Sequence, residues 1–141
     1  MAGRAPALNV EVANPMARRS IEIDSFKHVN PIPAASRIGP LLVSSVIVSR
    51  DPGTDHVPTD VDAQLANLFH HVGEMLEAAG ADWRHVAKMT FFVPDLAMRE
   101  AINKPWVERF PDPEARPARH TQIAAGTGKA ISCDFIAFVD D

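Results

Sequence analysis

The chain has little cysteine, no tyrosine and no long apolar segment. Its single cysteine, Cys133, cannot form an internal disulfide, which excludes a secreted scaffold held together by cross-links. No segment approaches the roughly 18 apolar residues that a membrane-spanning helix needs. The first 20 residues also lack the continuous apolar stretch of a signal peptide. The expected location is therefore the cytoplasm, with no membrane partner.

An excess of basic residues is also missing. The chain has 14 Lys and Arg against 18 Asp and Glu, a formal net charge of −4, and no run of five like charges. Nucleic-acid binding depends on neutralising phosphates, so this balance argues against a nucleic-acid partner. What is present, 141 residues of which 46% are hydrophobic, fits one globular domain with its own core.

Hydrophobic periodicity predicts elements in the order β, β, α, β, α, β, β. Residues 1–19 have no sustained period apart from a short strand expected at 8–12, and are interpreted as an extension to a single domain over 20–141. Strands are expected over 21–26, 41–49 and 85–93, with a proline-rich loop over 28–40. Two further strands, 119–125 and 130–139, are expected to form a hairpin around Gly126-Thr127-Gly128.

Two amphipathic helices complete the pattern. Over 59–80, an apolar stripe runs from Val61 to Ala79, with Thr59 as the expected cap and Gly80 as the stop. A second helix is expected over 95–110, where Pro105 marks a kink or a restart. Two helices and about five strands predict an α+β sheet with helices on one face. The other face is then expected to pack on further copies of the chain.

Most of the conventional catalytic patterns are missing. The six histidines show no metal-ligand spacing, and the adjacent His70 and His71 diverge by about 100° on a helix, so no metal site is expected. Gly126-x-Gly128-Lys129 lacks the remaining residues of a phosphate-binding loop and is interpreted as a turn. Cys133 lies among apolar strand residues and is interpreted as core.

Two polar residues in the last strands remain as candidates. In Pro117-Ala118-Arg119, an arginine opens a strand, and its planar donor fork matches a carboxylate. Asp134 lies in an otherwise apolar strand and needs a partner or water. Each has a structural alternative, namely a solvated edge arginine and a satisfied structural carboxylate. The expected hairpin allows the two side chains to lie near each other, but the sequence alone does not show that they do.

The order and spacing of several short motifs resemble the RidA/YjgF family of small trimeric imine and enamine deaminases. No single motif is diagnostic, and the resemblance covers about residues 20–139. The motifs are Ile38-Gly39-Pro40, the strand 42–49, the helix end 76–81, the segments 86–96 and 101–110, and Pro117-Ala118-Arg119 followed by a terminal strand with an acid before Ile136-Ala137.

The resemblance implies a chorismate-mutase-like α+β fold assembled as a homotrimer, with a central barrel of sheets, helices outside and active sites between subunits. It also implies hydrolysis of reactive 2-imino acids to 2-oxo acids and ammonia, without a metal or cofactor. Arg119 takes the place of the family arginine that binds the substrate carboxylate. Asp134 takes the place of the family glutamate that orients the hydrolytic water.

The chain departs from the family at several pocket positions. His120 stands where the family has a small residue, and Thr121 where it often has cysteine. Both are candidate substrate-binding residues, as is Asn103, which matches an asparagine of the second family helix. His120 would otherwise pack on the face away from Arg119, and Trp106 is interpreted as core. The aromatic residue of the first loop is absent at 30–32, and Ser44-Ser45 replace a glycine. These departures leave the substrate open.

Three functions stay open alongside simple 2-imino acid hydrolysis. One is deamination of a catabolic intermediate such as an aminomuconate, a longer dicarboxylate that the altered pocket would take. Another is a regulatory trimer that binds a small acid without turnover. Ribonuclease activity, described for some family members, fits poorly with the acidic charge.

Overall fold

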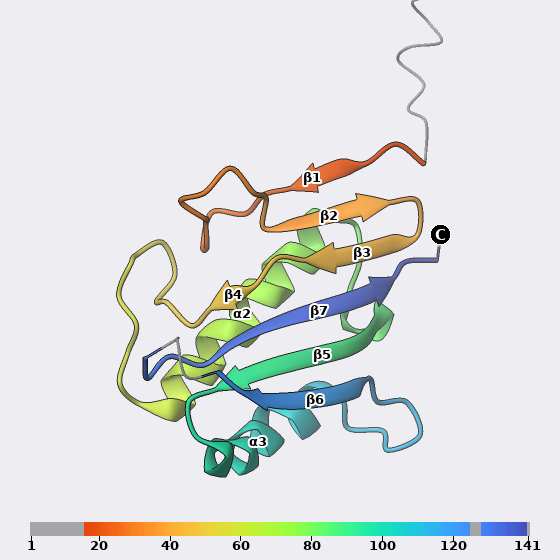
Figure 1. The fold of residues 1–141 in the computed structure, drawn as a ribbon. Helices are drawn as coiled ribbons and strands as arrows, with labels where there is room; N and C mark the ends of the chain where they lie inside the picture. The colour runs from red at the N-terminus through yellow and green to blue at the C-terminus, as the bar shows by residue number, and fades with distance from the viewer. Residues whose placement is uncertain (1–15, 125–127, 141) are drawn as a thin grey trace, which may run out of the picture.

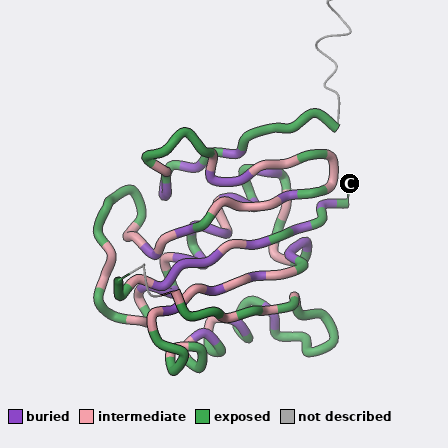
Figure 2. Tube along the Cα trace, in the orientation of Figure 1, coloured by how far each residue is buried: buried purple, intermediate pink, exposed green. Residues whose placement is uncertain are grey.

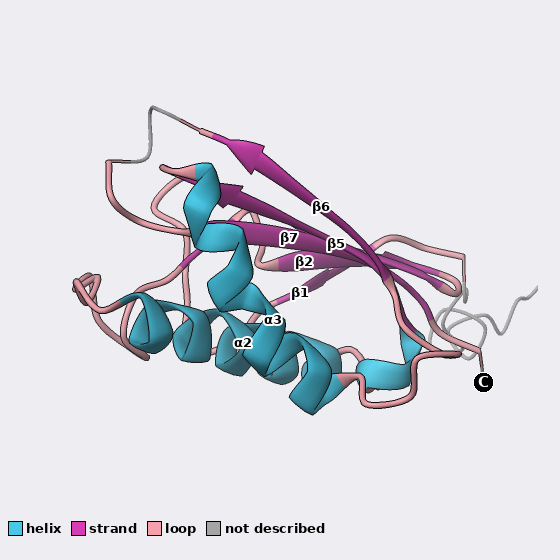
Figure 3. Ribbon diagram, turned by 90° about the horizontal axis from the view of Figure 1, so that it is seen from below, coloured by secondary structure: helices cyan, strands magenta, loops and turns pink. Residues whose placement is uncertain are grey.

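A single mixed sheet carries two helices on one side in the computed structural model, which describes residues 16–124 and 128–140 (Figures 1 and 3). The sheet order is β1-β2-β3-β7-β5-β6, with β4 also paired to β7. This confirms the expected α+β fold with both helices on one face, although the sheet has seven strands rather than about five. The strands are β1 (Arg19–Ile21), β2 (Ala35–Ile38), β3 (Leu41–Ser44), β4 (Ile47–Val48), β5 (Val86–Val93), β6 (Ala118–Ile123) and β7 (Ser132–Phe138).

The additional strands come from segments whose pattern is misleading. The prediction of a loop over 28–40 is wrong at Ala35–Ile38, which pairs with both β1 and β3 despite the surrounding prolines. The strand expected over 21–26 instead ends at Ile21. The strand expected over 41–49 divides into β3 and β4, because Ser45 turns away to bond the loop carbonyls of Ala34 and Pro33. The short strand expected at 8–12 lies outside the described residues.

The predicted hairpin between the last two strands is wrong. β5 lies between them, parallel to β6 and antiparallel to β7. A parallel pair needs a crossover, and the helix after β5 supplies it. The apolar β7 is best buried in the middle of the sheet, while the polar β6 suits an edge. Of the expected turn, Gly126 and Thr127 lie outside the described residues.

The helices are α2 (Val61–Ala78) and α3 (Arg99–Arg109), accompanied by the short 3-10 helices η1 (Trp83–His85) and η2 (Leu96–Met98). Asp60, rather than Thr59, caps α2, because its carboxylate accepts a hydrogen bond from the Ala63 amide at 2.9 Å. After α2, Gly80 adopts φ 78°, the left-handed conformation expected of a helix stop. α3 begins later than expected because η2, capped by Asp95, takes up the first residues.

The core fills the space between the sheet and the helices, and Figure 2 shows buried residues along the central strands and the helices. The predicted stripe of α2 is buried at its centre, where the side chains are at most 2% exposed: Leu65, Leu68, Phe69, Val72 and Leu76. They pack against β5 and β7, whose buried positions alternate along each strand.

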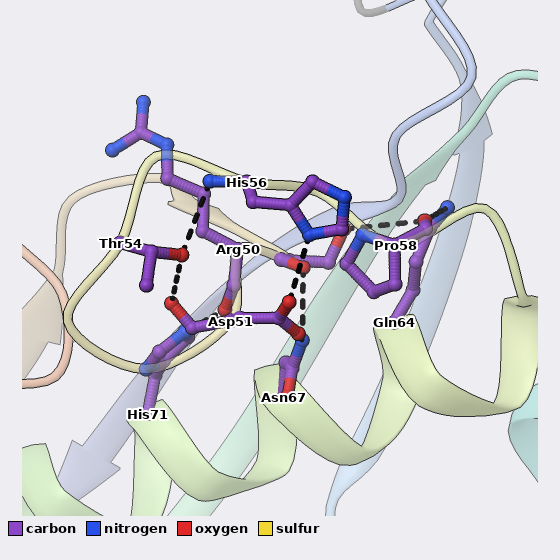
Figure 4. A network of polar contacts seen from close by, with 9 residues as sticks. Arg50, Asp51, Thr54, His56, Pro58, Gln64, Asn67 and His71 are labelled. Carbon is purple, nitrogen blue, oxygen red and sulfur yellow. Dashed lines mark hydrogen bonds and ion pairs between the residues drawn. The ribbon is translucent and has the colours of Figure 1, made fainter.

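Polar contacts fasten the loop between β4 and α2 to the helix (Figure 4). Asp51 accepts a hydrogen bond from the Asn67 amide and pairs with His56, both at 2.8 Å. The buried Gln64 donates to the Pro58 carbonyl at 2.8 Å. Its side-chain oxygen accepts from the Ile131 amide, also at 2.8 Å. Gln64 therefore ties α2 both to this loop and to the segment that precedes β7.

His71 is a fully buried histidine on α2 that forms two hydrogen bonds. Nε2 donates to the Arg50 carbonyl at 2.8 Å, and Nδ1 accepts from the Ser25 hydroxyl at 2.9 Å. Burial lowers the pKa of His71 below its ordinary value of 6.5. At a pH between the folded pKa and the ordinary pKa, the unfolded chain therefore binds a proton at His71 that the folded chain does not. Stability should be fully present above about pH 6.5 and should fall as the pH drops toward the lower folded pKa.

The expected result is a loss of unfolding free energy between about pH 7.5 and about pH 5.5, measured by urea denaturation, that is smaller in His71→Gln than in the wild type. His70→Gln is the comparison variant, because His70 is exposed, pairs with Glu74 at 3.2 Å and is only a minor cause of the lowered pKa of His71. It should reduce the pH dependence less than His71→Gln does. An equal pH dependence in His71→Gln and the wild type would contradict the role of His71.

Candidate functional site

The candidate residues divide between the two faces of the sheet. Arg119 and Thr121 are in register with the buried Met89 and Phe91 of β5, and so lie on the helix-covered side. His120 and Asp134 are in register with Thr90, on the opposite side. We call this opposite side the open face, and its residues on the last three strands of the sheet order are Lys88, Thr90, Phe92, His120, Gln122, Asp134, Ile136 and Phe138.

Arg119 lies where the edge strand β6 meets α3. Its Nη2 donates to Asn103 Oδ1 at 2.8 Å, and its guanidinium lies 5.2 Å from the centre of the Trp106 ring. Asn103 and Trp106 are three residues apart, so they share one face of α3. The structure therefore brings together Arg119, Asn103 and Trp106, with Thr121 on the same side of β6. We call Arg119, Asn103, Trp106 and Thr121 the edge site.

The Arg119 guanidinium keeps donors for a ligand. Its side chain is half-buried, and desolvation lowers its pKa, with a smaller contribution from the positive charge of Arg99. Because a guanidinium is so strongly basic, the group remains charged at neutral pH. Within 16–124 and 128–140 it forms no ion pair with an acidic side chain. The remaining N–H groups of its planar fork match a carboxylate.

Asp134 is not brought to Arg119 within one chain. The two lie on opposite faces, and because β5 separates their strands they are also about 10 Å apart across the sheet. The expectation that a hairpin joins them is therefore wrong. Asp134 is half-buried, and burial raises the pKa of its carboxyl, although the nearby charge of Lys88 partly opposes this. His120 is exposed on the same face.

Cys133 and Trp106, which are interpreted as core residues from the sequence, both lie in the hydrophobic core. Cys133 is fully buried, and burial raises the pKa of its thiol, which disfavours the reactive thiolate. Trp106 is 7% exposed, and its ring centre lies 4.8 Å from that of Phe110 and 6.4 Å from that of Phe91. Trp106 thus belongs to the core, and the Arg119 guanidinium lies over its ring.

Sequence reasoning missed Arg99, whose charge acts on Arg119. No motif marks this residue, which is the first of α3. The available signal was its spacing, because Arg99 precedes Asn103 by four residues and so lies on the same helix face. That spacing gains meaning only once Asn103 is known to contact Arg119.

The open face carries an exposed apolar patch beside its polar residues, which include His120 and Asp134. The patch extends over β2, β3 and β7 in register. Its large side chains are Ile38, Leu41, Ile136 and Phe138, which are 37%, 45%, 43% and 60% exposed. Adjacent exposed apolar side chains of this kind are typical of contact with another protein surface. As for a bilayer, none of the helices in the described part of the chain has the length and apolar character to cross one.

Comparison with known proteins gives a consistent result. The family model described as Endoribonuclease L-PSP matches residues 16–130. The chain is 32% identical over 124 residues to Reactive Intermediate Deaminase A, chloroplastic, of Arabidopsis thaliana, and this match covers 79% of the chain but only 65% of that longer protein. It is 30% identical over 110 residues to the 2-iminobutanoate/2-iminopropanoate deaminase of Escherichia coli K12, covering 77% of the chain and 86% of that protein.

The fold leads to the same family. The crystal structure of the YjgF gene product from E. coli matches with a TM-score of 0.75 and 27% sequence identity, covering 85% of this chain and 98% of that one. A putative endoribonuclease from Thermotoga maritima, at 24% identity, shares the fold with a TM-score of 0.79. Because the family model covers most of the chain and the architecture agrees, the chain belongs to the Endoribonuclease L-PSP family, the RidA/YjgF family.

Proposed function

We propose that this protein hydrolyses reactive 2-imino acids, and their enamine tautomers, to 2-oxo acids and ammonia. The observation that carries the proposal is the half-buried guanidinium of Arg119, held by Asn103 and Trp106 with donors left for a carboxylate. The E. coli and Arabidopsis relatives, which are named as deaminases, support the reaction class.

The chemistry asks little of the protein. Water adds to the electrophilic imine carbon to form a carbinolamine, the C–N bond then breaks as C=O forms, and ammonia leaves with the proton it gains. No electrons are exchanged, so we propose that the reaction runs without a cofactor. Arg119 binds the substrate carboxylate, and Thr121 lies two residues further along β6 on the same side. Fixing the substrate against a positioned water supplies much of the rate.

We extend the proposal to a homotrimer in which neighbouring subunits cover the open face. The exposed apolar patch of Ile38, Leu41, Ile136 and Phe138 supports this extension. In the proposed trimer, the Asp134 carboxylate orients the hydrolytic water for the edge site of a neighbouring chain. His120, on the same face as Asp134, then lines that subunit contact.

The reaction is tested by generating imines with an amino-acid oxidase and trapping them with semicarbazide. The protein should lower the yield of semicarbazone and raise the initial rate at which 2-oxo acid and ammonia form. Trapping that is unchanged by this protein, while the E. coli deaminase lowers it in the same assay, would overturn the proposed function.

A further inference from the structure

Arg99 places a second positive charge beside the edge site. It is the first residue of α3 and precedes Asn103 by about one helical turn on the same face. Since Asn103 contacts Arg119, that face of α3 is turned toward β6. Arg99 is also near enough for its charge to contribute to the lowered pKa of Arg119.

The direction of the chain places Arg99 along the edge strand. β5 and β6 are parallel and in register up to Val93 and Ile123. After Val93, the chain passes through η2, which contacts β6, and α3 then runs back along the sheet. Arg99 therefore lies beyond Arg119, toward the end of β6. Thr121 lies about 7 Å along β6 from Arg119 in that same direction.

The two arginines lack an acidic partner. Within the described part of the chain, neither forms an ion pair, and Glu100, the next residue after Arg99, pairs with neither. Like charges held near one another are unfavourable. Arg99 is also unfavourably placed, since the N-terminal end of a helix favours negative rather than positive charge. A ligand with two negative charges would relieve both effects.

Building on the proposed function, we propose that the substrate is a 2-imino dicarboxylic acid. Arg119 binds the carboxylate next to the imine carbon. Arg99 binds the second carboxylate, toward the end of β6, with Thr121 between the two. Arg99 lies one helical turn, about 5.4 Å, from the Asn103 that holds Arg119, which favours a short dicarboxylic acid. Arg99 then determines specificity, whereas Arg119 is needed for every substrate.

Steady-state kinetics with two imines test this assignment. One imine is generated from aspartate or glutamate by a dicarboxylate-specific amino-acid oxidase, and the other from alanine. The wild type should hydrolyse the dicarboxylic imine with a kcat/KM at least about tenfold higher. Arg99→Gln should remove that advantage while changing kcat/KM for the alanine-derived imine less than about twofold.

Lys104→Gln is the matched control, because it removes one positive charge from the same helix. Lys104 lines the groove between α2 and α3, together with Asp62 and Glu108, rather than the edge site. We expect Lys104→Gln to retain the wild-type preference. An equal loss of preference in Lys104→Gln and Arg99→Gln would show a general charge effect and overturn the assignment.

Calorimetric binding of 2-oxoglutarate and 2-oxobutanoate separates this inference from the proposed function. The wild type should bind 2-oxoglutarate more tightly, and Arg99→Gln should bind both acids alike. If neither imine is hydrolysed but 2-oxoglutarate binding requires both arginines, the proposed function fails and the two-arginine site stands. If imines are hydrolysed with no dicarboxylate preference and Arg99→Gln changes nothing, the inference fails and the proposed function stands.

Discussion

Replacing Arg119 with glutamine is expected to lower kcat/KM for 2-imino acids by about 100-fold. The guanidinium provides charge-assisted hydrogen bonds to the substrate carboxylate, and bonds to charged groups contribute up to about 3 kcal/mol each. Glutamine keeps a polar side chain but is two atoms shorter, so the hydrogen bond to Asn103 Oδ1 is lost together with the charge. Steady-state kinetics in the imine assay, with thermal unfolding recorded alongside, measures both effects.

Two further variants sharpen this result. Arg119→Lys keeps the charge but loses the planar fork, so its kcat/KM should lie between those of the wild type and Arg119→Gln. Arg109→Gln is the control, because Arg109 also lies on α3 and stacks on aromatic rings, those of Phe69 and Trp83, away from the edge site. If Arg119→Gln retained kcat/KM within about threefold of the wild type, the carboxylate would be bound elsewhere.

Two variants that are each inactive should regain activity when mixed. In the proposed trimer, a site takes Arg119 from one chain and Asp134 from a neighbour, since one chain holds these residues on opposite faces. Random reassembly of equal amounts of Arg119→Gln and Asp134→Asn should then restore about a quarter of the sites. The measurement is the specific activity of co-refolded protein compared with each variant refolded alone.

The matching control mixes wild type with the double variant Arg119→Gln/Asp134→Asn. Sites shared between chains should again give about a quarter of the full activity, whereas sites within one chain should give about half. If the mixture of Arg119→Gln and Asp134→Asn were no more active than the single variants, Arg119 and Asp134 of a site would come from the same chain. Full activity of Asp134→Asn alone would remove Asp134 from the reaction.

Local elements were predictable because periodicity reports which side chains are buried. The stripe of α2 between Leu65 and Leu76 is an example, and its burial is confirmed. Strand neighbours were not predictable in this way. The alternation along β6 and β7 is the same whether the two strands pair with each other or both pair with β5. Only the crossover through α3 decides between these arrangements.

In the candidate site, too, single residues were predictable from the sequence but their contacts were not. Arg119 could be singled out because it opens a strand after a proline, and Asn103 because the resemblance matches it to an asparagine of the second family helix. Their hydrogen bond depends on how α3 packs against β6, which neither local sequence determines. Buried polar residues such as Gln64 and His71 are missed for a related reason. Their partners come from distant loops, and an apolar pattern contains no information about those partners.

The position of β7 between β3 and β5 has a consequence for synthesis on the ribosome. β7 is the last of the described strands to be made, yet it is the neighbour that joins β1–β3 to β5–β6. While Ser132–Phe138 is still in the exit tunnel, the growing chain exposes two unpaired strand edges that invite pairing with other chains. Emergence of this segment therefore sets the earliest moment at which the sheet can close, and until then the nascent chain most needs chaperone protection.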